Sequence, residues 1–143
     1  MPSFTQRIPN LQQVGPVIEV TLMPSSLYLN QMKISPSAAR SVRLSAMIDT
    51  GATGTAVKDG ILSGLGINPI GTILINTPSS TDVSCNQYDI QIVFPYNNVN
   101  MPSIVVTEAP LQGQHIQCLI GRDILQLGVL IYVGYDNSFT LSF

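Results

Sequence analysis

An apolar segment leads directly into an Asp-Thr-Gly motif in the stretch Ala46-Met47-Ile48-Asp49-Thr50-Gly51-Ala52-Thr53. Glycine tolerates backbone conformations that other residues avoid, so Gly51 allows a sharp turn and a close approach of neighbouring backbone. Asp49 would then stand at the end of a rigid strand, where a catalytic carboxylate is best held in place. The same residues also fit a plain surface turn capped by Asp49, because Asp and Gly favour turns. The motif alone leaves both interpretations open.

A second element lies far downstream, in Leu119-Ile120-Gly121-Arg122-Asp123-Ile124-Leu125. It has the pattern of an apolar strand, a glycine and a short helix. Between the two elements the sequence predicts a hairpin, because β-rich segments at 71–76 and 88–94 flank a turn that begins Thr77-Pro78-Ser79-Ser80. The chain thus predicts two strand-to-loop elements with a hairpin between them.

Short β-rich segments separated by turn residues fill most of the chain, and 10 prolines and 11 glycines leave little room for long helices. Strands are predicted at 16–22, 41–48, 71–76, 88–94, 103–107, 115–120, 129–133 and 138–142, and short helices at 58–65 and 122–127. Residues 24–40 are interpreted as a loop with a brief strand at 27–29. Strands this frequent in 143 residues predict an all-β barrel or sandwich.

The charge composition narrows the classes of function. Only 10% of the residues are charged and the formal net charge is −2, with no basic stripe, so we expect no nucleic-acid binding. A surface with so few charges favours contact with a partner surface, and a second copy of the chain is the simplest partner. The chain length is that of one domain, which we take to be 1–143.

Cofactor and membrane sites are not expected either. Cys85, Cys118 and His115 do not have the number or the spacing of a zinc site or a disulfide framework, so we expect no metal and no cofactor. The first residues contain no long apolar segment, and no apolar run is long enough to span a bilayer. We therefore expect no membrane contact and a cytoplasmic location.

Taken together, the two elements and the hairpin resemble the retropepsins, the single-domain aspartic proteases typified by the retroviral proteases. In that family an Asp-Thr-Gly loop is followed by a flap hairpin, two apolar residues, Gly-Arg-Asn/Asp and a short helix. The resemblance covers 42–143, whereas 1–41 is a divergent N-terminal part. It implies an all-β, retropepsin-like acid-protease fold: a closed, barrel-like homodimeric domain with a flap hairpin and one or two short helices.

The resemblance also implies roles for particular residues. Asp49 would be catalytic, with Thr50, Gly51, Ala52 and Thr53 supporting its loop and Gly121, Arg122 and Asp123 supporting it from the second motif. The substrate-binding flap would comprise Ile75, Asn76, Thr77, Pro78, Ser79 and Ser80. Viral members often have an acidic residue where Thr53 stands, so Arg122 must find another partner or a carbonyl. For Asp123, a helix-start or network role is favoured over a catalytic one.

The implied activity is that of an aspartic endopeptidase acting on extended polypeptide segments with apolar residues at the scissile bond. One chain supplies one Asp-Thr-Gly, so a homodimer would provide the two carboxylates that share a proton around a water molecule. Ala52 lacks the hydroxyl found in pepsin-like enzymes, and we expect a mildly acidic working pH. The terminal segments 2–8 and 138–143 are the expected dimer interface. The alternatives are a catalytically silent or weak dimeric peptide-binding module, and an unrelated β-sandwich.

Overall fold

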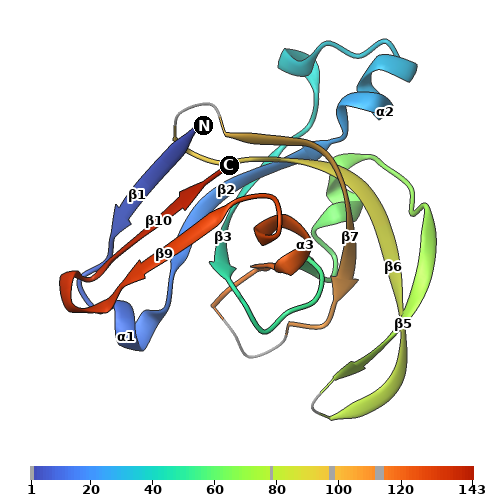
Figure 1. The fold of residues 1–143 in the computed structure, drawn as a ribbon. Helices are drawn as coiled ribbons and strands as arrows, with labels where there is room; N and C mark the ends of the chain where they lie inside the picture. The colour runs from blue at the N-terminus through green and yellow to red at the C-terminus, as the bar shows by residue number, and fades with distance from the viewer. Residues whose placement is uncertain (1, 78, 97–98, 112–114) are drawn as a thin grey trace.

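The computed structural model describes residues 2–77, 79–96, 99–111 and 115–143, and within them the chain is built mainly from strands (Figure 1). The strands are β1 (Ser3–Arg7), β2 (Val17–Pro24), β3 (Val42–Ile48), β4 (Ala56–Lys58), β5 (Gly71–Thr77), β6 (Ser80–Val93), β7 (Asn100–Ala109), β8 (Cys118–Ile120), β9 (Val129–Val133) and β10 (Ser138–Ser142). The helices are α1 (Leu11–Val14), α2 (Ser26–Gln31) and α3 (Arg122–Leu125), with 3-10 turns η1 (Pro36–Ala38), η2 (Leu62–Leu65) and η3 (Gly134–Asp136).

The larger of two sheets closes on itself. Its strand order is β2-β3-β8-β4-β7-β6-β5, and β2 pairs with β6 as well, so six strands form a ring and β5 extends it beyond β6. The β5–β6 hairpin projects away from this ring (Figure 1). The structure therefore confirms the predicted all-β, barrel-like fold with a flap hairpin.

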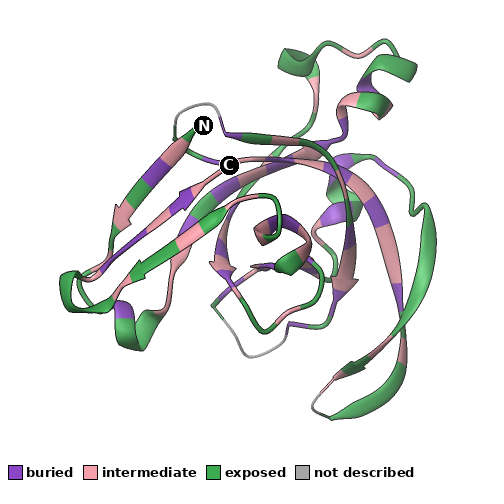
Figure 2. Ribbon diagram, in the orientation of Figure 1, coloured by how far each residue is buried: buried purple, intermediate pink, exposed green. Residues whose placement is uncertain are grey.

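Side-chain alternation on the strands builds the barrel core. On β6, Tyr88, Ile90 and Ile92 are buried, whereas the residues between them are only partly buried. β3 follows the same rule with Leu44, Ala46 and Ile48. This period of two is the pattern of strands with one face on a core, and Figure 2 shows the contrast with the largely exposed β5. The core thus fixes the end of β3, where Asp49 follows.

The smaller sheet joins the two ends of the chain. Its order is β1-β10-β9, so β10 hydrogen-bonds to β1 on one side and to β9 on the other. Phe4, Phe139 and Leu141 point into the core and are almost fully buried. Both terminal segments are strands, but they pair with each other within one chain, which leaves β10 no free edge to offer a partner.

Several local predictions need correction. Residues 24–40 contain the helix α2 rather than a strand at 27–29, because Ser25 accepts a hydrogen bond from the Tyr28 backbone N–H (3.1 Å) and so caps a helix. The predicted helices shorten to η2 and α3, and β4 was missed. The strand predicted at 115–120 is only β8, so His115 lies outside it. None of the helices in the described ranges is long and apolar enough to cross a membrane.

Candidate active site

Asp49 stands where β3 leaves the barrel. Its backbone N–H donates to the carbonyl of Ile120 at 2.9 Å, which continues the parallel pairing of β3 with β8 by one residue. One carboxylate oxygen, Oδ1, accepts the Gly51 backbone N–H at 2.9 Å. The Ala52 N–H reaches back to the Asp49 carbonyl at 3.2 Å. These hydrogen bonds hold the carboxylate at the start of a tight turn, and Asp49 is half-buried there.

The second motif locks this turn from outside. The backbone N–H groups of Arg122 and Asp123 donate to the carbonyls of Ala52 (2.9 Å) and Thr53 (3.2 Å). Gly121 lies so close to the loop that a Cβ there would come within 2.4 Å of the Gly54 carbonyl carbon. Since no side chain fits at this distance, the glycine is required for the close approach of the two segments.

Arg122 completes the contact without an ion pair. Its guanidinium donates to the Thr50 carbonyl (2.9 Å) and to the Thr53 hydroxyl (3.2 Å). Because Thr53 is not acidic, Arg122 was predicted to bond to another partner or to a carbonyl, and its hydrogen bond to the Thr50 carbonyl confirms this. The arginine therefore ties α3 directly to the Asp-Thr-Gly loop.

Asp123 is a structural network residue in this chain. Its carboxylate accepts three hydrogen bonds: Oδ1 from the Thr55 hydroxyl (2.7 Å) and the Ile124 N–H (2.9 Å), and Oδ2 from the Thr55 N–H (2.9 Å). The Thr55 hydroxyl in turn accepts the Gly121 N–H at 3.1 Å. Sequence reasoning missed Thr55, whose only signal is its position two residues beyond Thr53.

Replacing Thr55 by valine keeps the shape of this buried side chain and removes its hydroxyl. The Gly121 N–H then loses its acceptor and the Asp123 carboxylate loses one donor. A buried polar group left without a partner costs about 1–3 kcal/mol, so we expect Thr55→Val to lower the free energy of unfolding by that amount. Urea unfolding measures it, and Ser63→Ala, at an exposed hydroxyl of η2, is the control with little expected effect. Equal stability of wild type and Thr55→Val would contradict this account.

A cleft of about 530 Å³ opens between residues 52–56, which directly follow the Asp-Thr-Gly motif, and the flap hairpin; Asp49, Thr50 and Gly51 are not among its lining residues. From the predicted site it is lined by Ala52 and Thr53 on one side, Ile75 and Asn76 on the other, and Asp123. Thr77, Ser79 and Ser80 at the hairpin tip do not line it, and Pro78 lies outside the described residues. Thr77 and Ser80 instead bond to each other, because the Thr77 hydroxyl accepts the Ser80 N–H at 3.1 Å.

Other walls of the cleft were not predicted from the sequence. They come from β5, β6 and β7, namely Ile73, Gln87, Val105 and Thr107. Their only sequence signal is strand alternation: Ile73 and Ile75 are two apart on β5, and Val105 and Thr107 are two apart on β7, so each pair shares a face. Ile73, Ile75 and Val105 make the walls from β5 and β7 largely apolar, and the amides of Asn76 and Gln87 add polar groups to the threonines and Asp123.

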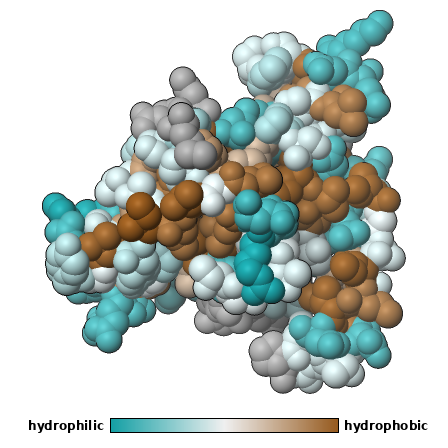
Figure 3. Space-filling view, in the orientation of Figure 1, coloured by the Kyte–Doolittle hydropathy of each residue, from teal (hydrophilic) through white to brown (hydrophobic). Residues whose placement is uncertain are grey.

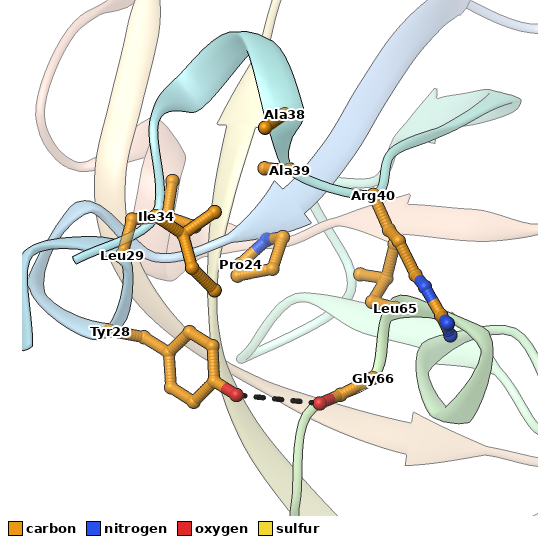
Figure 4. Close-up of a pocket in the computed structure, with 9 residues that line it drawn as sticks. All are labelled: Pro24, Tyr28, Leu29, Ile34, Ala38, Ala39, Arg40, Leu65 and Gly66. Carbon is orange, nitrogen blue, oxygen red and sulfur yellow. Dashed lines mark hydrogen bonds between the residues drawn. The ribbon is translucent and has the colours of Figure 1, made fainter. Parts of the chain in front are cut away.

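A second cavity of about 300 Å³ lies between α2, η1 and η2 (Figure 4). Pro24, Leu29, Ile34 and Leu65 form its apolar walls, and Tyr28 donates a hydrogen bond from its hydroxyl to the Gly66 carbonyl at 3.4 Å. None of its lining residues belongs to the Asp-Thr-Gly loop or the flap. This cavity lies between the N-terminal part and η2 and is separate from the candidate active site.

The cysteines take no part in the site. Both are free, and burial raises the pKa of the Cys118 thiol to about 12, so that side chain is a neutral packing group. Burial also raises the pKa of Cys85. Within the described part of the chain, no group of three or more His, Cys, Asp or Glu side chains could hold a metal ion.

Comparison with known proteins finds similarity at the level of the fold. No family model and no curated protein matches the sequence. Among solved structures, a retropepsin-like aspartic protease from Rickettsia conorii is similar, with a TM-score of 0.52 and 14% sequence identity over 100% of this chain and 95% of that one. The foamy viral protease-reverse transcriptase in complex with an RNA/DNA hybrid gives a TM-score of 0.49 and 17% identity, over 78% of this chain and 12% of that one. By its strand topology and the first of these similarities, the chain has the retropepsin-like aspartic protease fold.

Proposed function

We propose that this protein is an aspartic endopeptidase that works as a homodimer, with Asp49 of each copy forming the catalytic pair. The observation that carries the proposal is the placement of Asp49. Its carboxylate is fixed by the Gly51 N–H at the end of β3, and Ala52 and Thr53, which follow in the same loop, line the cleft beneath the flap hairpin. The chain contains one Asp-Thr-Gly, so the second carboxylate must come from a second copy.

The chemistry follows from two carboxylates held close together. Both cannot ionise easily, so the pair shares one proton. The ionised carboxylate takes a proton from the water that attacks the peptide carbonyl carbon. The protonated carboxylate donates to the carbonyl oxygen, and a proton then passes to the leaving amine as the C–N bond breaks. No covalent enzyme intermediate is formed.

The cleft supports an extended substrate with apolar side chains. Ile73, Ile75 and Val105 offer apolar contact, and burial of an apolar side chain against them is favourable by about 25 cal/mol for each Å² removed from water. The amides of Asn76 and Gln87 are suited to hydrogen bonds with the substrate backbone. The substrate class is therefore a polypeptide segment in extended conformation.

The test is cleavage of a diverse peptide library by the full chain between about pH 4 and pH 7, with Asp49→Asn as the comparison. Cuts made by the wild type and absent from Asp49→Asn, with apolar residues at the scissile bond, are the expected result. If neither protein cuts while the wild type sediments as a dimer, the endopeptidase proposal fails. Binding of library peptides by that dimer would then identify a silent peptide-binding module.

The residue after Asp-Thr-Gly is expected to set the pH of maximal activity. Ala52 has no hydroxyl to donate to the catalytic pair. A serine there adds a donor that favours the charged carboxylate, so we expect Ala52→Ser to move the acidic limb of the pH–rate profile to lower pH. Steady-state rates across pH on one peptide measure this. Thr53→Ser, which changes the next side chain and keeps its hydroxyl, is the control, and an unmoved acidic limb in Ala52→Ser would contradict the expectation.

A further inference from the structure

The cavity between α2, η1 and η2 has walls of its own and takes no part in the proposed reaction. Its volume is about 300 Å³, at the lower end of the range for small-molecule sites. Segment 24–40, which carries α2 and η1, lies outside the barrel strands (Figure 1) and faces η2 across the cavity. The cavity is thus a separate place with room for one small molecule or for the end of a peptide.

Buried side chains and hydrogen bonds hold the walls of the cavity in place. Leu29 and Leu65 are almost fully buried, so they fix α2 and η2 to the core. The Ile34 N–H donates to the Leu29 carbonyl at 2.9 Å, which folds the chain after α2 back toward that helix. The hydrogen bond from the Tyr28 hydroxyl to the Gly66 carbonyl joins the two sides (Figure 4). The cavity is therefore preformed, and a ligand need not order its walls on binding.

Among the described residues, Arg40 is the only charged one that lines the cavity. It packs beside Gly66, where an added Cβ would lie 3.6 Å from Nη1 of the guanidinium. Within the ranges that the structure describes, Arg7 and Arg43 have carboxylate partners, whereas the Arg40 guanidinium has neither an ion pair nor a hydrogen bond. Because a planar guanidinium matches a carboxylate with two parallel hydrogen bonds, Arg40 is suited to a carboxylate ligand.

The walls and the charge together select the class of ligand. Pro24, Leu29, Ile34 and Leu65 offer contact to an apolar body, and Arg40 offers contact to an anionic group. Figure 3 shows hydrophobic residues beside hydrophilic ones over the part of the molecule that holds α2 and η1. A small inorganic anion would leave the apolar walls unused, a metal ion would be repelled by the guanidinium, and an uncharged apolar molecule would leave the arginine unpaired. A ligand with an apolar body and one carboxylate uses both features.

We propose that this cavity binds a small carboxylate with an apolar body, which places its carboxylate on Arg40 and its body against Leu29, Ile34 and Leu65. Two sources supply this chemistry: a medium-chain fatty acid, and the C-terminal end of a peptide whose last residue is apolar. An endopeptidase that cuts at apolar residues releases ends of the second kind. The binding itself does not depend on the proposed function, because none of the lining residues belongs to the Asp-Thr-Gly loop or the flap.

The first experiment is an NMR titration of the isotope-labelled full chain at about pH 7, where a carboxylate is ionised. Octanoate should shift the backbone amide signals of Leu29, Ile34 and Gly66. From butanoate through hexanoate to octanoate, the affinity should rise about fourfold for each added CH₂ group until the cavity is full. Octanol has the same chain without the charge and should bind at least about 10-fold more weakly than octanoate.

A second pair of probes distinguishes the two sources of the carboxylate. N-acetyl-leucine presents the C-terminal end of a peptide, and N-acetyl-leucinamide presents the same body without the charge. Tighter binding of N-acetyl-leucine than of hexanoate would support the proposal with a peptide end as the ligand, and the reverse order would support it with a fatty acid. Equal binding of N-acetyl-leucine and its amide, together with equal binding of octanoate and octanol, would overturn it.

Three variants test the charge and the walls separately, and their amide spectra show whether they fold. Arg40→Gln removes the charge and should weaken octanoate binding at least about 10-fold. Arg43→Gln is the matched control, because this exposed arginine does not line the cavity, and it should leave the affinity unchanged. Ala39→Leu fills the cavity from a half-buried wall position, and its extended backbone (φ −72°, ψ 145°) is one that leucine adopts, so it should abolish binding.

Two results would overturn the proposal: no shift of the cavity amides in the wild type with any of the carboxylates, or wild-type affinity for octanoate in both Arg40→Gln and Ala39→Leu. None of these measurements uses peptide cleavage. Failure of the carboxylate site would therefore leave the endopeptidase proposal standing, and failure of the endopeptidase proposal would leave the carboxylate site standing.

Discussion

Asp49→Asn is expected to reduce peptide cleavage about 100-fold to 10,000-fold while leaving the fold intact. An amide can neither take a proton from the attacking water nor share one with its mate, and removal of a positioned general base or acid costs about 10²–10⁴ in rate. The Gly51 N–H keeps an acceptor, because the Asn side-chain oxygen can replace Oδ1 of Asp49. The rate on the best library peptide measures the effect, and thermal unfolding confirms the fold.

Mixing the variant with wild type separates a dimeric from a monomeric mechanism. If one site needs an Asp49 from each copy, a mixed dimer is inactive. With free exchange of subunits, an equal amount of Asp49→Asn should halve the activity of a fixed amount of wild type, and a ninefold excess should leave about one tenth. Activity that stays constant as the variant is added, after incubation long enough for exchange, would show that one chain cleaves by itself.

The parts of the site that sequence predicted are those determined by local chemistry. Asp49 follows an apolar strand directly, and Gly51 is the residue that a sharp turn needs, so both could be placed from a few neighbours. Arg122 could be assigned a non-acidic partner because Thr53 carries no charge. The prediction of a barrel likewise follows from strand frequency and alternation along the chain.

The parts that were missed depend on contacts between distant segments. Thr55 has its role only because Gly121 and Asp123 are brought to it by the pairing of β4 with β8. The cleft walls on β7 similarly depend on which strands become neighbours. Helix α2 is a different case, since Ser25 offers a local capping signal, but the Pro-Ser-Ser sequence around it equally favours a loop.

The terminal strands carry an expectation about the dimer that stays a prediction. The segments 2–8 and 138–143 are the expected dimer interface, and deletion of the second is the simplest test of that expectation. Phe139 and Leu141 are fully buried within one chain, however, and β10 pairs on both sides. Removing two such side chains costs several kcal/mol, so that deletion would unfold the protein and would not report on association.

Among substitutions that add one methyl group near the site, Gly121→Ala is expected to cause the largest loss of stability. The new Cβ would stand 2.4 Å from the Gly54 carbonyl carbon, 2.5 Å from its oxygen and 2.9 Å from the Thr55 nitrogen. These are backbone atoms that cannot rotate away as a side chain can. They are also held by the hydrogen bonds of Arg122 and Asp123 to the same loop, so relief of the overlap must break part of that network.

Overpacking in a well-packed region costs about 1–3 kcal/mol, and the rigid surroundings place Gly121→Ala at about 3 kcal/mol or above. For a chain of this size that corresponds to a fall in melting temperature of about 10 °C.

The backbone of Gly121 is extended (φ −90°, ψ −177°), which alanine adopts without strain, so lack of space is the only cause. Gly64→Ala is the matched control, since a Cβ there meets nothing within 4 Å, and its effect should stay within about 0.5 kcal/mol. Because the displaced loop carries Asp49, the folded fraction of Gly121→Ala should also cleave peptides more slowly than wild type. A Gly121→Ala protein with wild-type stability and rate would mean that the two motifs are not packed as closely as the structure has them.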